Sequence, residues 1–299
     1  MRSDPGEIAR YLCCPDDGAE LAARAGGLRC VHCSRDFVFL RPNLVEILPS
    51  RPIAISDSDV PRTYGNAYVQ AYSEVREALD EETTWGAPES LTAKAARSRE
   101  RQSEEALRLL FDGGGADGVF CDLSAGAGLT TFAAARNARL VFHCDLSVAA
   151  VGYASTAATR MALDNMVVVR ADYFRPPFRG SIQRLTCLDS LIRGPRHDVR
   201  LLESIRRALA PDGSAVVDFH NWWHNPLRRL GLLRQNFGEN RSYTREEVLK
   251  LLAQAGIDHF MIRAFVQESD GRSLPGKMLA RVMPATRFVV RFMADKSAV

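Results

Sequence analysis

At 299 residues the chain exceeds the roughly 100–200 residues of a typical single core, so we expect one large domain with a smaller appendage. Hydrophobic residues make up 46% and charged residues 25%, and no apolar run approaches a membrane-spanning length, which excludes disordered, fibrous and membrane classes. The net charge of +3 is too small to indicate nucleic-acid binding by itself. Asp4 and Glu7 interrupt the stretch that a signal peptide would need, so a cytoplasmic location is expected.

The N-terminal region carries four of the seven cysteines in a spacing that is typical of metal ligands. Cys30 and Cys33 form a Cys-x-x-Cys knuckle, and the segment from Cys14 has the shape of a second knuckle, with Asp17 where cysteine is usual. Zinc prefers four ligands in a closed structural site and accepts carboxylate oxygen. We therefore predict structural zinc on Cys14, Asp17, Cys30 and Cys33, with Cys13 as an alternative fourth ligand. A metal-free ribbon held by its apolar residues is the competing interpretation.

Changes in composition divide the chain into three parts. The first part, residues 1–50, is rich in predicted β-structure. A stretch with several prolines and no periodicity, Pro49–Pro61, is typical of a linker and is followed by two segments of helical spacing, Asn66–Glu82 and Ser90–Phe111. The predicted parts are a zinc-ribbon-like domain at 1–50, a linker with N-terminal helices at 51–112, and the main domain at 113–299.

In the main domain, short apolar strands alternate with helices, which indicates an α/β fold with a doubly wound, mostly parallel sheet of seven strands. The predicted strands are Val119–Leu123, Leu140–Asp145, Met166–Arg170, Leu185–Asp189, Ser214–Phe219, Phe260–Phe265 and Thr286–Phe292. The predicted helices are Leu129–Asn137, Ser147–Asp164, Asp198–Ala210 and Arg245–Ala255. The remaining cysteines, Cys121, Cys144 and Cys187, lie in apolar runs and are expected in the core.

A turn of small residues follows the first strand of this sheet. The strand ends in Asp122, and the turn Ser124–Gly128 leads into a helix, an arrangement that lets a ligand approach the backbone closely. The next strand ends in Asp145, which can accept both hydroxyl hydrogens of a ribose. The third strand leads to Asp172 and Tyr173. Because parallel strands end at one edge of the sheet, these residues are expected to converge on one nucleoside.

The run Asp122-Leu123-Ser124-Ala125-Gly126-Ala127-Gly128 resembles the glycine motif of class I S-adenosylmethionine-dependent methyltransferases, acid-apolar-Gly-x-Gly-x-Gly, with Ser124 in place of the first glycine. The segment Arg206–Ser214 is similar to the family's helix and turn before the fifth strand. The resemblance covers most of the chain after Gly118 and implies S-adenosylmethionine as cofactor. It implies that Asp145 holds the ribose, Asp172 the adenine amino group, the Ser124–Gly128 loop the methionine portion, and Cys187–Leu191 the face beside the sulfonium. The implied cofactor-binding residues are Asp122, Ser124, Ala125, Gly126, Gly128, Asp145, Leu146, Asp172, Tyr173 and Asp189.

Two further comparisons bear on these motifs. A dinucleotide-binding dehydrogenase would also have a glycine turn and an acid after the second strand, but its Gly-x-Gly-x-x-Gly pattern would need glycine where this chain has Thr131. Residues 10–50 resemble the zinc ribbons of some bacterial rRNA guanine methyltransferases and of small partner proteins in methyltransferase complexes. Because of this resemblance, RNA remains an alternative substrate.

The methyl acceptor is expected over the ends of the fourth and fifth strands, because ligands of open α/β sheets bind beyond the carboxyl ends of the strands. His220 and His224 follow the fifth strand and are the candidate general bases, with His220 preferred because it follows directly on the strand. Trp222 and Trp223 are suited to stacking on a planar methyl acceptor or to packing in a lid. A segment rich in arginine and leucine after Pro226 is predicted to be a lid helix.

We predict methyl transfer from S-adenosylmethionine to an oxygen or nitrogen atom, or alternatively carbon or sulfur, of a small-molecule or peptide acceptor. No Asn-Pro-Pro-aromatic motif follows the fourth strand, which argues against methylation of exocyclic amino groups. The alternatives are an rRNA or tRNA methyltransferase that grips RNA with its ribbon, and a noncatalytic binding protein on the same fold. No membrane partner is expected.

Overall fold

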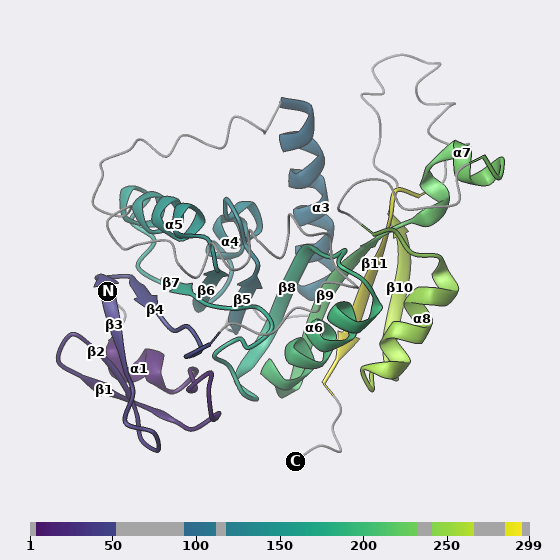
Figure 1. The fold of residues 1–299 in the computed structure, drawn as a ribbon. Coiled ribbons are helices and arrows are strands. Elements are labelled where there is room, and N and C mark those ends of the chain that lie inside the picture. The colour runs from purple at the N-terminus through teal and green to yellow at the C-terminus, as the bar shows by residue number, and fades with distance from the viewer. Residues whose placement is uncertain (1–3, 52–92, 112–117, 233–240, 266–284, 295–299) are drawn as a thin grey trace.

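The computed structural model describes residues 4–51, 93–111, 118–232, 241–265 and 285–294 (Figure 1). The predicted helix at Asn66–Glu82 and most of the predicted linker lie outside these residues. The division into parts at 1–50, 51–112 and 113–299 therefore stays a prediction.

The described strands form one continuous sheet in the order β1-β2-β3-β4-β7-β6-β5-β8-β9-β11-β10 (Figure 1). Strands β4 to β9 of this order run parallel, and β11 is inserted antiparallel between β9 and β10. The strands are β1 Leu21–Arg24, β2 Gly27–Cys30, β3 Asp36–Arg41, β4 Leu44–Glu46, β5 Val119–Leu123, β6 Leu140–Asp145, β7 Met166–Arg170, β8 Ile182–Leu191, β9 Leu209–His220, β10 Phe260–Phe265 and β11 Arg287–Met293. The predicted doubly wound sheet of seven strands is confirmed in β5 to β11.

The N-terminal ribbon is part of this sheet. Strands β1, β2, β3 and β4 form an antiparallel meander, and β4 then pairs in parallel with β7, with Leu44 opposite Val168. A helical turn, α1 (Pro5–Ala9), packs on β1 and β2 and buries Ile8. A β-rich N-terminal region was predicted and is confirmed, but its hydrogen bonding to β7 was not foreseen.

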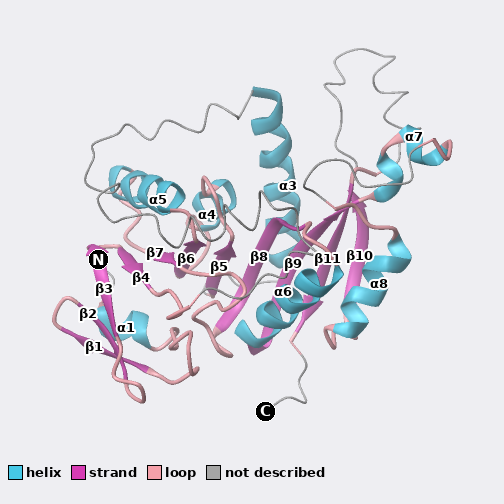
Figure 2. Cartoon of the chain, in the orientation of Figure 1, coloured by secondary structure: helices cyan, strands magenta, loops and turns pink. Residues whose placement is uncertain are grey.

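Helices cover both faces of the sheet (Figure 2). The covering helices are α3 Ala93–Phe111, α4 Leu129–Ala134, α5 Val148–Arg160, α6 Pro195–Ala208 and α8 Arg245–Gln254. The 3-10 helix η2 (Trp222–His224) and the short helix α7 (Pro226–Arg229) follow the end of β9. Side chains alternate along a strand, so neighbouring residues face opposite helix layers. Phe120 belongs to the cluster that includes residues of α3 and α4, whereas Cys121 belongs to the cluster that includes residues of α6 and α8.

Most of the predicted helices end earlier than expected. The helix expected to reach Ala210 ends at Ala208, because β9 already begins at Leu209, which pairs with Ile182. The register shifts between this pair and the next, so the turn at Pro211–Gly213 lies inside β9 rather than before it. A Cβ atom on Gly213 would lie 2.6 Å from the Ile182 carbonyl oxygen, which explains why only glycine fits.

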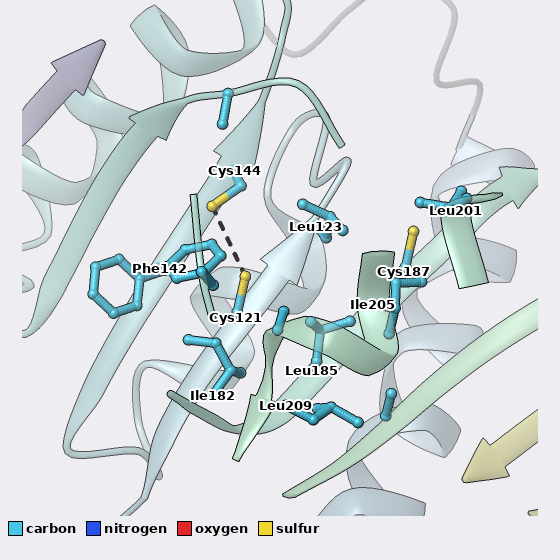
Figure 3. Packing of buried hydrophobic residues seen from close by; sticks show 14 of the residues in the cluster. Cys121, Leu123, Phe142, Cys144, Ile182, Leu185, Cys187, Leu201, Ile205 and Leu209 are labelled. Atoms are coloured by element: carbon cyan, nitrogen blue, oxygen red, sulfur yellow. Dashed lines mark hydrogen bonds between the residues drawn. The ribbon is translucent and has the colours of Figure 1, made fainter. Parts of the chain in front are cut away.

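The three scattered cysteines are core residues, as predicted. Cys121, Cys144 and Cys187 are each fully buried, and the Sγ atoms of Cys121 and Cys144 lie 3.8 Å apart on neighbouring strands (Figure 3). Leu185 on β8 and Ile205 on α6 belong to the same buried cluster as the three cysteines (Figure 3). Among the described helices, none combines the length and apolar character needed to cross a membrane.

Candidate active site

The turn after β5 has the backbone that a close ligand approach requires. Ser124, Gly126 and Gly128 have φ angles of 61°, 53° and 79°, in the left-handed region that favours glycine. The N–H of Ala125 donates to the Cys144 carbonyl of β6 at 3.0 Å, which ties the turn to the next strand. A Cβ atom on Gly128 would lie 2.9 Å from the Phe132 ring, so a side chain there would collide.

Asp122 lies at the end of β5 beneath this turn and is almost fully buried. Its carboxylate accepts hydrogen bonds from the hydroxyls of Thr131 on α4, at 2.7 Å, and Thr186 on β8, at 2.8 Å. Burial raises the pKa of Asp122 to about 6, against the effect of these hydrogen bonds. Thr131, where a dinucleotide-binding turn would have glycine, therefore uses its side chain to hold the turn to the strand.

Asp145 lies at the end of β6 and faces the turn from the other side. Its Oδ2 atom accepts the Gly126 N–H at 2.8 Å, and its Oδ1 atom accepts the Ser147 N–H at 2.9 Å. Each carboxylate oxygen can accept a second hydrogen bond. Asp145 thus shapes the loop at the wall of the pocket.

A pocket with a volume of about 230 Å³ opens between this turn, the end of β8 and helix α3. Among the described residues that line it, the acidic ones are Asp122, Asp145 and Asp189, and none is lysine, arginine or histidine. The described residues of the lining are Gln102, Ser103, Asp122, Ser124, Ala125, Gly126, Ala127, Leu129, Thr130, Asp145, Leu188, Asp189 and Ser190. The electrostatics of the pocket favour a cationic ligand.

Four of the predicted cofactor residues lie outside this lining, namely Gly128, Leu146, Asp172 and Tyr173. Asp172 is fully buried, and its Oδ1 atom accepts the N–H of Phe174 at 2.9 Å. The Tyr173 ring packs on Phe174, with 4.4 Å between the ring centroids. The pocket therefore brings together the loop, Asp145 and Asp189, but not the residues expected around an adenine.

Helix α3 forms one wall of the pocket, which the sequence analysis did not foresee. Gln102 donates to the buried carboxylate of Asp218 at 2.8 Å, and the hydroxyls of Ser103 and Thr130 lie 2.8 Å apart. Gln102 lies four residues before the buried Ala106, on the same helix face. The polar residues Gln102 and Ser103 before the buried Ala106 were the available signal for a pocket wall, although α3 alone does not indicate that Gln102 reaches Asp218.

A cluster of charges lies where β8, β9 and β11 meet. Arg287 on β11 ion-pairs with Asp189, with 2.5 Å between Nη1 and Oδ1, and also with Asp218. His220 approaches the same Asp189 oxygen with its Nε2 atom at 3.3 Å. Burial alone would raise the pKa of Asp189, but the His220 hydrogen bond and the Arg287 charge outweigh burial and hold the pKa well below the usual range. Asp218 and Arg287 were not predicted as site residues.

The second candidate base, His224, ends η2 just beyond β9. Its Nδ1 atom is buried and has no hydrogen-bond partner among the described residues. Trp222 stacks under the Arg228 guanidinium, which lies 4.0 Å from the ring centroid, while Trp223 is exposed. The predicted lid begins as the short helix α7, and residues 233–240 lie outside the described part of the chain.

The ribbon brings the four predicted metal ligands together. One ligand atom each of Cys14, Asp17, Cys30 and Cys33 lies within 4.8 Å of the others. The Sγ atoms of Cys14 and Cys33 are 3.8 Å apart, which is about the edge of a tetrahedron with zinc–sulfur bonds of roughly 2.3 Å. The donor set therefore fits zinc. Cys13, the alternative ligand, does not belong to this group.

One neighbour of the metal-ligand group, His32, was not predicted. The His32 Nδ1 atom lies 3.0 Å from the Asp17 Oδ2 atom, so the imidazole can orient this carboxylate. His32 lies within the Cys30–Cys33 knuckle, and its place beside two candidate ligands was the available signal.

Comparisons with known proteins agree with this architecture. Residues 120–213, which include the glycine turn, match the family described as "Methyltransferase domain". A magnesium protoporphyrin IX methyltransferase from Synechocystis PCC 6803, solved with S-adenosylmethionine, superimposes with a TM-score of 0.53 at 14% identity, covering 82% of this chain and 100% of its own. A geranyl diphosphate C-methyltransferase from Streptomyces coelicolor A3(2) gives 0.51 at 20% identity, covering 72% and 88%. No curated protein matches the sequence.

Residues 120–213 therefore match a methyltransferase domain, and the chain shares the fold of the S-adenosylmethionine-dependent methyltransferases named above. The chain is therefore an enzyme of the methyltransferase class, with a cysteine-containing ribbon on the edge of its sheet.

Proposed function

We propose that the pocket at the glycine turn binds S-adenosylmethionine, and that the enzyme methylates a small-molecule or peptide acceptor at oxygen or nitrogen, or alternatively at carbon or sulfur. The observation that supports this most is the charge of the pocket, whose described lining residues include three aspartates and no basic side chain. S-adenosylmethionine carries a sulfonium and an ammonium cation, whereas a dinucleotide carries an anionic pyrophosphate. The lining fits the first and repels the second.

Each wall of the pocket has its own role in this proposal. Asp145 accepts the ribose hydroxyls, the Ser124–Gly128 loop receives the methionine portion, and Asp189 lies beside the sulfonium. With a volume of about 230 Å³ the pocket is smaller than the roughly 300–1,000 Å³ of typical ligand sites. It accommodates the methionine and ribose side, and Asp172 and Tyr173 remain the proposed neighbours of the adenine.

When bound, S-adenosylmethionine supplies an activated methyl group whose sulfonium is already a good leaving group. The enzyme then has to hold the methyl acceptor in line and remove its proton. We assign the proton transfer to His220. An ionised carboxylate only accepts hydrogen bonds, so the Nε2 atom that faces Asp189 carries hydrogen, and Nδ1 is left with the lone pair. His224 is the second candidate base.

An RNA substrate is the main alternative, with the ribbon as the part that grips it. In that case the enzyme would methylate rRNA or tRNA, and added RNA would compete with any small molecule that binds in the acceptor position. A noncatalytic protein on the same fold would bind neither methyl donor nor methyl acceptor productively. The acidic pocket fits S-adenosylmethionine in both cases, so the feature that separates them is the continuous basic surface that RNA contacts would need.

We further propose that the ribbon holds one structural zinc ion and that the enzyme acts in the cytoplasm. Three thiols and one carboxylate fill the four positions of a closed zinc site. Such a site stabilises a fold and leaves no open position for chemistry. The free cysteines of the core agree with a reducing compartment.

Calorimetry with S-adenosylmethionine and S-adenosylhomocysteine tests the cofactor assignment. We expect Asp145→Ala to weaken binding by about 1.5–3 kcal/mol, because the variant loses charge-assisted hydrogen bonds to the ribose. Asp258→Ala is the matched control, since Asp258 is exposed between α8 and β10 and should leave affinity unchanged. Equal affinity of the Asp145 variant and the wild type would place the cofactor elsewhere.

A further inference from the structure

Arg287 occupies a special position in the strand pairing. In the antiparallel pair of β9 and β11, Arg287 lies directly opposite His220. Both side chains approach the Oδ1 atom of Asp189, Arg287 with Nη1 at 2.5 Å and His220 with Nε2 at 3.3 Å. One oxygen of Asp189 therefore has two donors. No described residue donates to the other oxygen, Oδ2.

The backbone of Asp189 is also held in an unusual state. Its φ angle is 59°, a left-handed conformation that residues other than glycine adopt at a cost. Two contacts offset this cost. The Asp189 N–H donates to the Asp218 Oδ1 atom at 2.7 Å, and the side chain binds Arg287. Strain of this kind in a pocket wall indicates a functional constraint on Asp189.

Buried Asp218 connects these elements. It accepts hydrogen bonds from Asp189 on β8, Gln102 on α3 and Arg287 on β11. The guanidinium of Arg287 lies between two carboxylates, and its planar fork of donors suits such double pairing. The sheet thus supplies a rigid support behind the pocket wall.

We propose that Arg287 is a positioning residue of the cofactor pocket: with His220 it binds the Oδ1 atom of Asp189 and leaves the Oδ2 atom to a cationic group of the cofactor. This proposal rests on the proposed function, because it assumes that S-adenosylmethionine occupies the pocket. Arg287 itself is not in the lining and acts through Asp189. Since it carries a positive charge, it would repel a cationic ligand if its charge acted alone.

A double-mutant cycle on the full chain tests the proposal, with dissociation constants for S-adenosylmethionine measured by calorimetry. We expect Asp189→Asn to weaken binding about tenfold and Arg287→Gln about fivefold. The double variant should bind like Asp189→Asn alone, because Arg287 acts only through Asp189. Arg287→Lys should bind within about twofold of the wild type. Arg263→Gln on β10 is the control and should leave affinity unchanged.

The outcomes separate this proposal from the proposed function. Wild-type protein that binds neither S-adenosylmethionine nor S-adenosylhomocysteine would refute the function itself. If the wild type binds and folded Arg287→Gln binds equally well or more tightly, Arg287 contributes structure or charge but no positioning. The proposal would also be overturned if the effects of the two substitutions on the dissociation constant multiplied in the double variant. Should Arg287→Gln not fold, Arg287→Gln with Asp218→Asn replaces it in the cycle, because this pair removes both buried charges together.

Discussion

The ribbon and the cofactor pocket are two sites built in opposite ways. The four candidate metal ligands come from Cys14 to Cys33, a single short stretch of the chain. The pocket is lined by residues of α3, of β8, of the end of β6, and of β5 with the turn and helix that follow it. These lining residues lie between Gln102 and Ser190 in the sequence. The first site depends on local turns, and the second depends on how distant elements pack. The contrast explains why the two sites differ in how well their residues can be predicted.

Each knuckle of the ribbon is shaped by its own backbone. The Cys14 carbonyl accepts the Gly18 N–H at 2.8 Å, and the Cys30 carbonyl accepts the Ser34 N–H at 3.1 Å. Gly18 and Ser34 both have positive φ angles, of 73° and 60°. The two turns are thus alike, and each is closed by a hydrogen bond within its own knuckle.

Removing the metal ligands should have the largest effect. We expect about one zinc ion per chain in the wild type and none in Cys30→Ser with Cys33→Ser, since two remaining ligands cannot hold a closed site. The free energy of unfolding should fall by several kcal/mol. Because β4 pairs with β7, the loss should reach the main sheet. Elemental analysis and denaturant unfolding measure both effects.

Cys13→Ser is the matched control for this comparison. Cys13 is adjacent to a proposed ligand but outside the group of four, so its variant should keep the zinc. Metal-free wild-type protein prepared without chelator would remove the zinc assignment. Loss of zinc from Cys13→Ser would instead show that the ligand set is wrong.

The next largest effect is expected from His220→Ala, which tests the second of the two sites, the cofactor pocket with the charged residues beside it. If His220 is the general base, turnover should fall by about 10²- to 10⁴-fold. Cofactor affinity should stay within about threefold, because Arg287 still binds Asp189. The measurement requires the methyl acceptor, which a metabolite comparison of deletion and wild-type cells would identify.

His259→Ala, at an exposed histidine before β10, is the control for this variant. A variant without both His220 and His224 that keeps wild-type turnover would rule out a histidine base. Asp189 would then be the remaining candidate base among the described residues.

Residues whose placement follows from their own strand were predictable. The bounds of β5, β6 and β7 were predicted to the residue, because buried parallel strands are short apolar runs between polar turns. Asp145 was predicted to lie at a strand end and does, beside the loop. Gln102 and Arg287 were missed, since nothing in α3 or β11 alone indicates that they reach Asp218. Their roles arise from packing between elements far apart in sequence.

Two glycines allow the smallest and most direct test of the difference between the two regions. Gly26 in the ribbon and Gly128 in the cofactor turn have nearly equal φ angles, 74° and 79°. A Cβ atom on Gly26 meets nothing within 4 Å, whereas one on Gly128 would lie 2.9 Å from the Phe132 ring and 3.3 Å from His143. Both alanine variants should therefore lose about 1 kcal/mol of stability from the backbone alone.

Only Gly128→Ala should lose more, because Phe132 must move to admit the methyl group. We expect a total of about 2 kcal/mol for Gly128→Ala in denaturant unfolding, together with weaker binding of S-adenosylmethionine, since the displaced loop shapes the pocket. Gly26→Ala should leave cofactor affinity unchanged. Equal losses of stability would mean that Phe132 yields freely, and unchanged affinity in Gly128→Ala would mean that the turn is not part of the binding site. The pair holds the backbone cost constant, so any difference between the variants measures how closely the cofactor turn is packed.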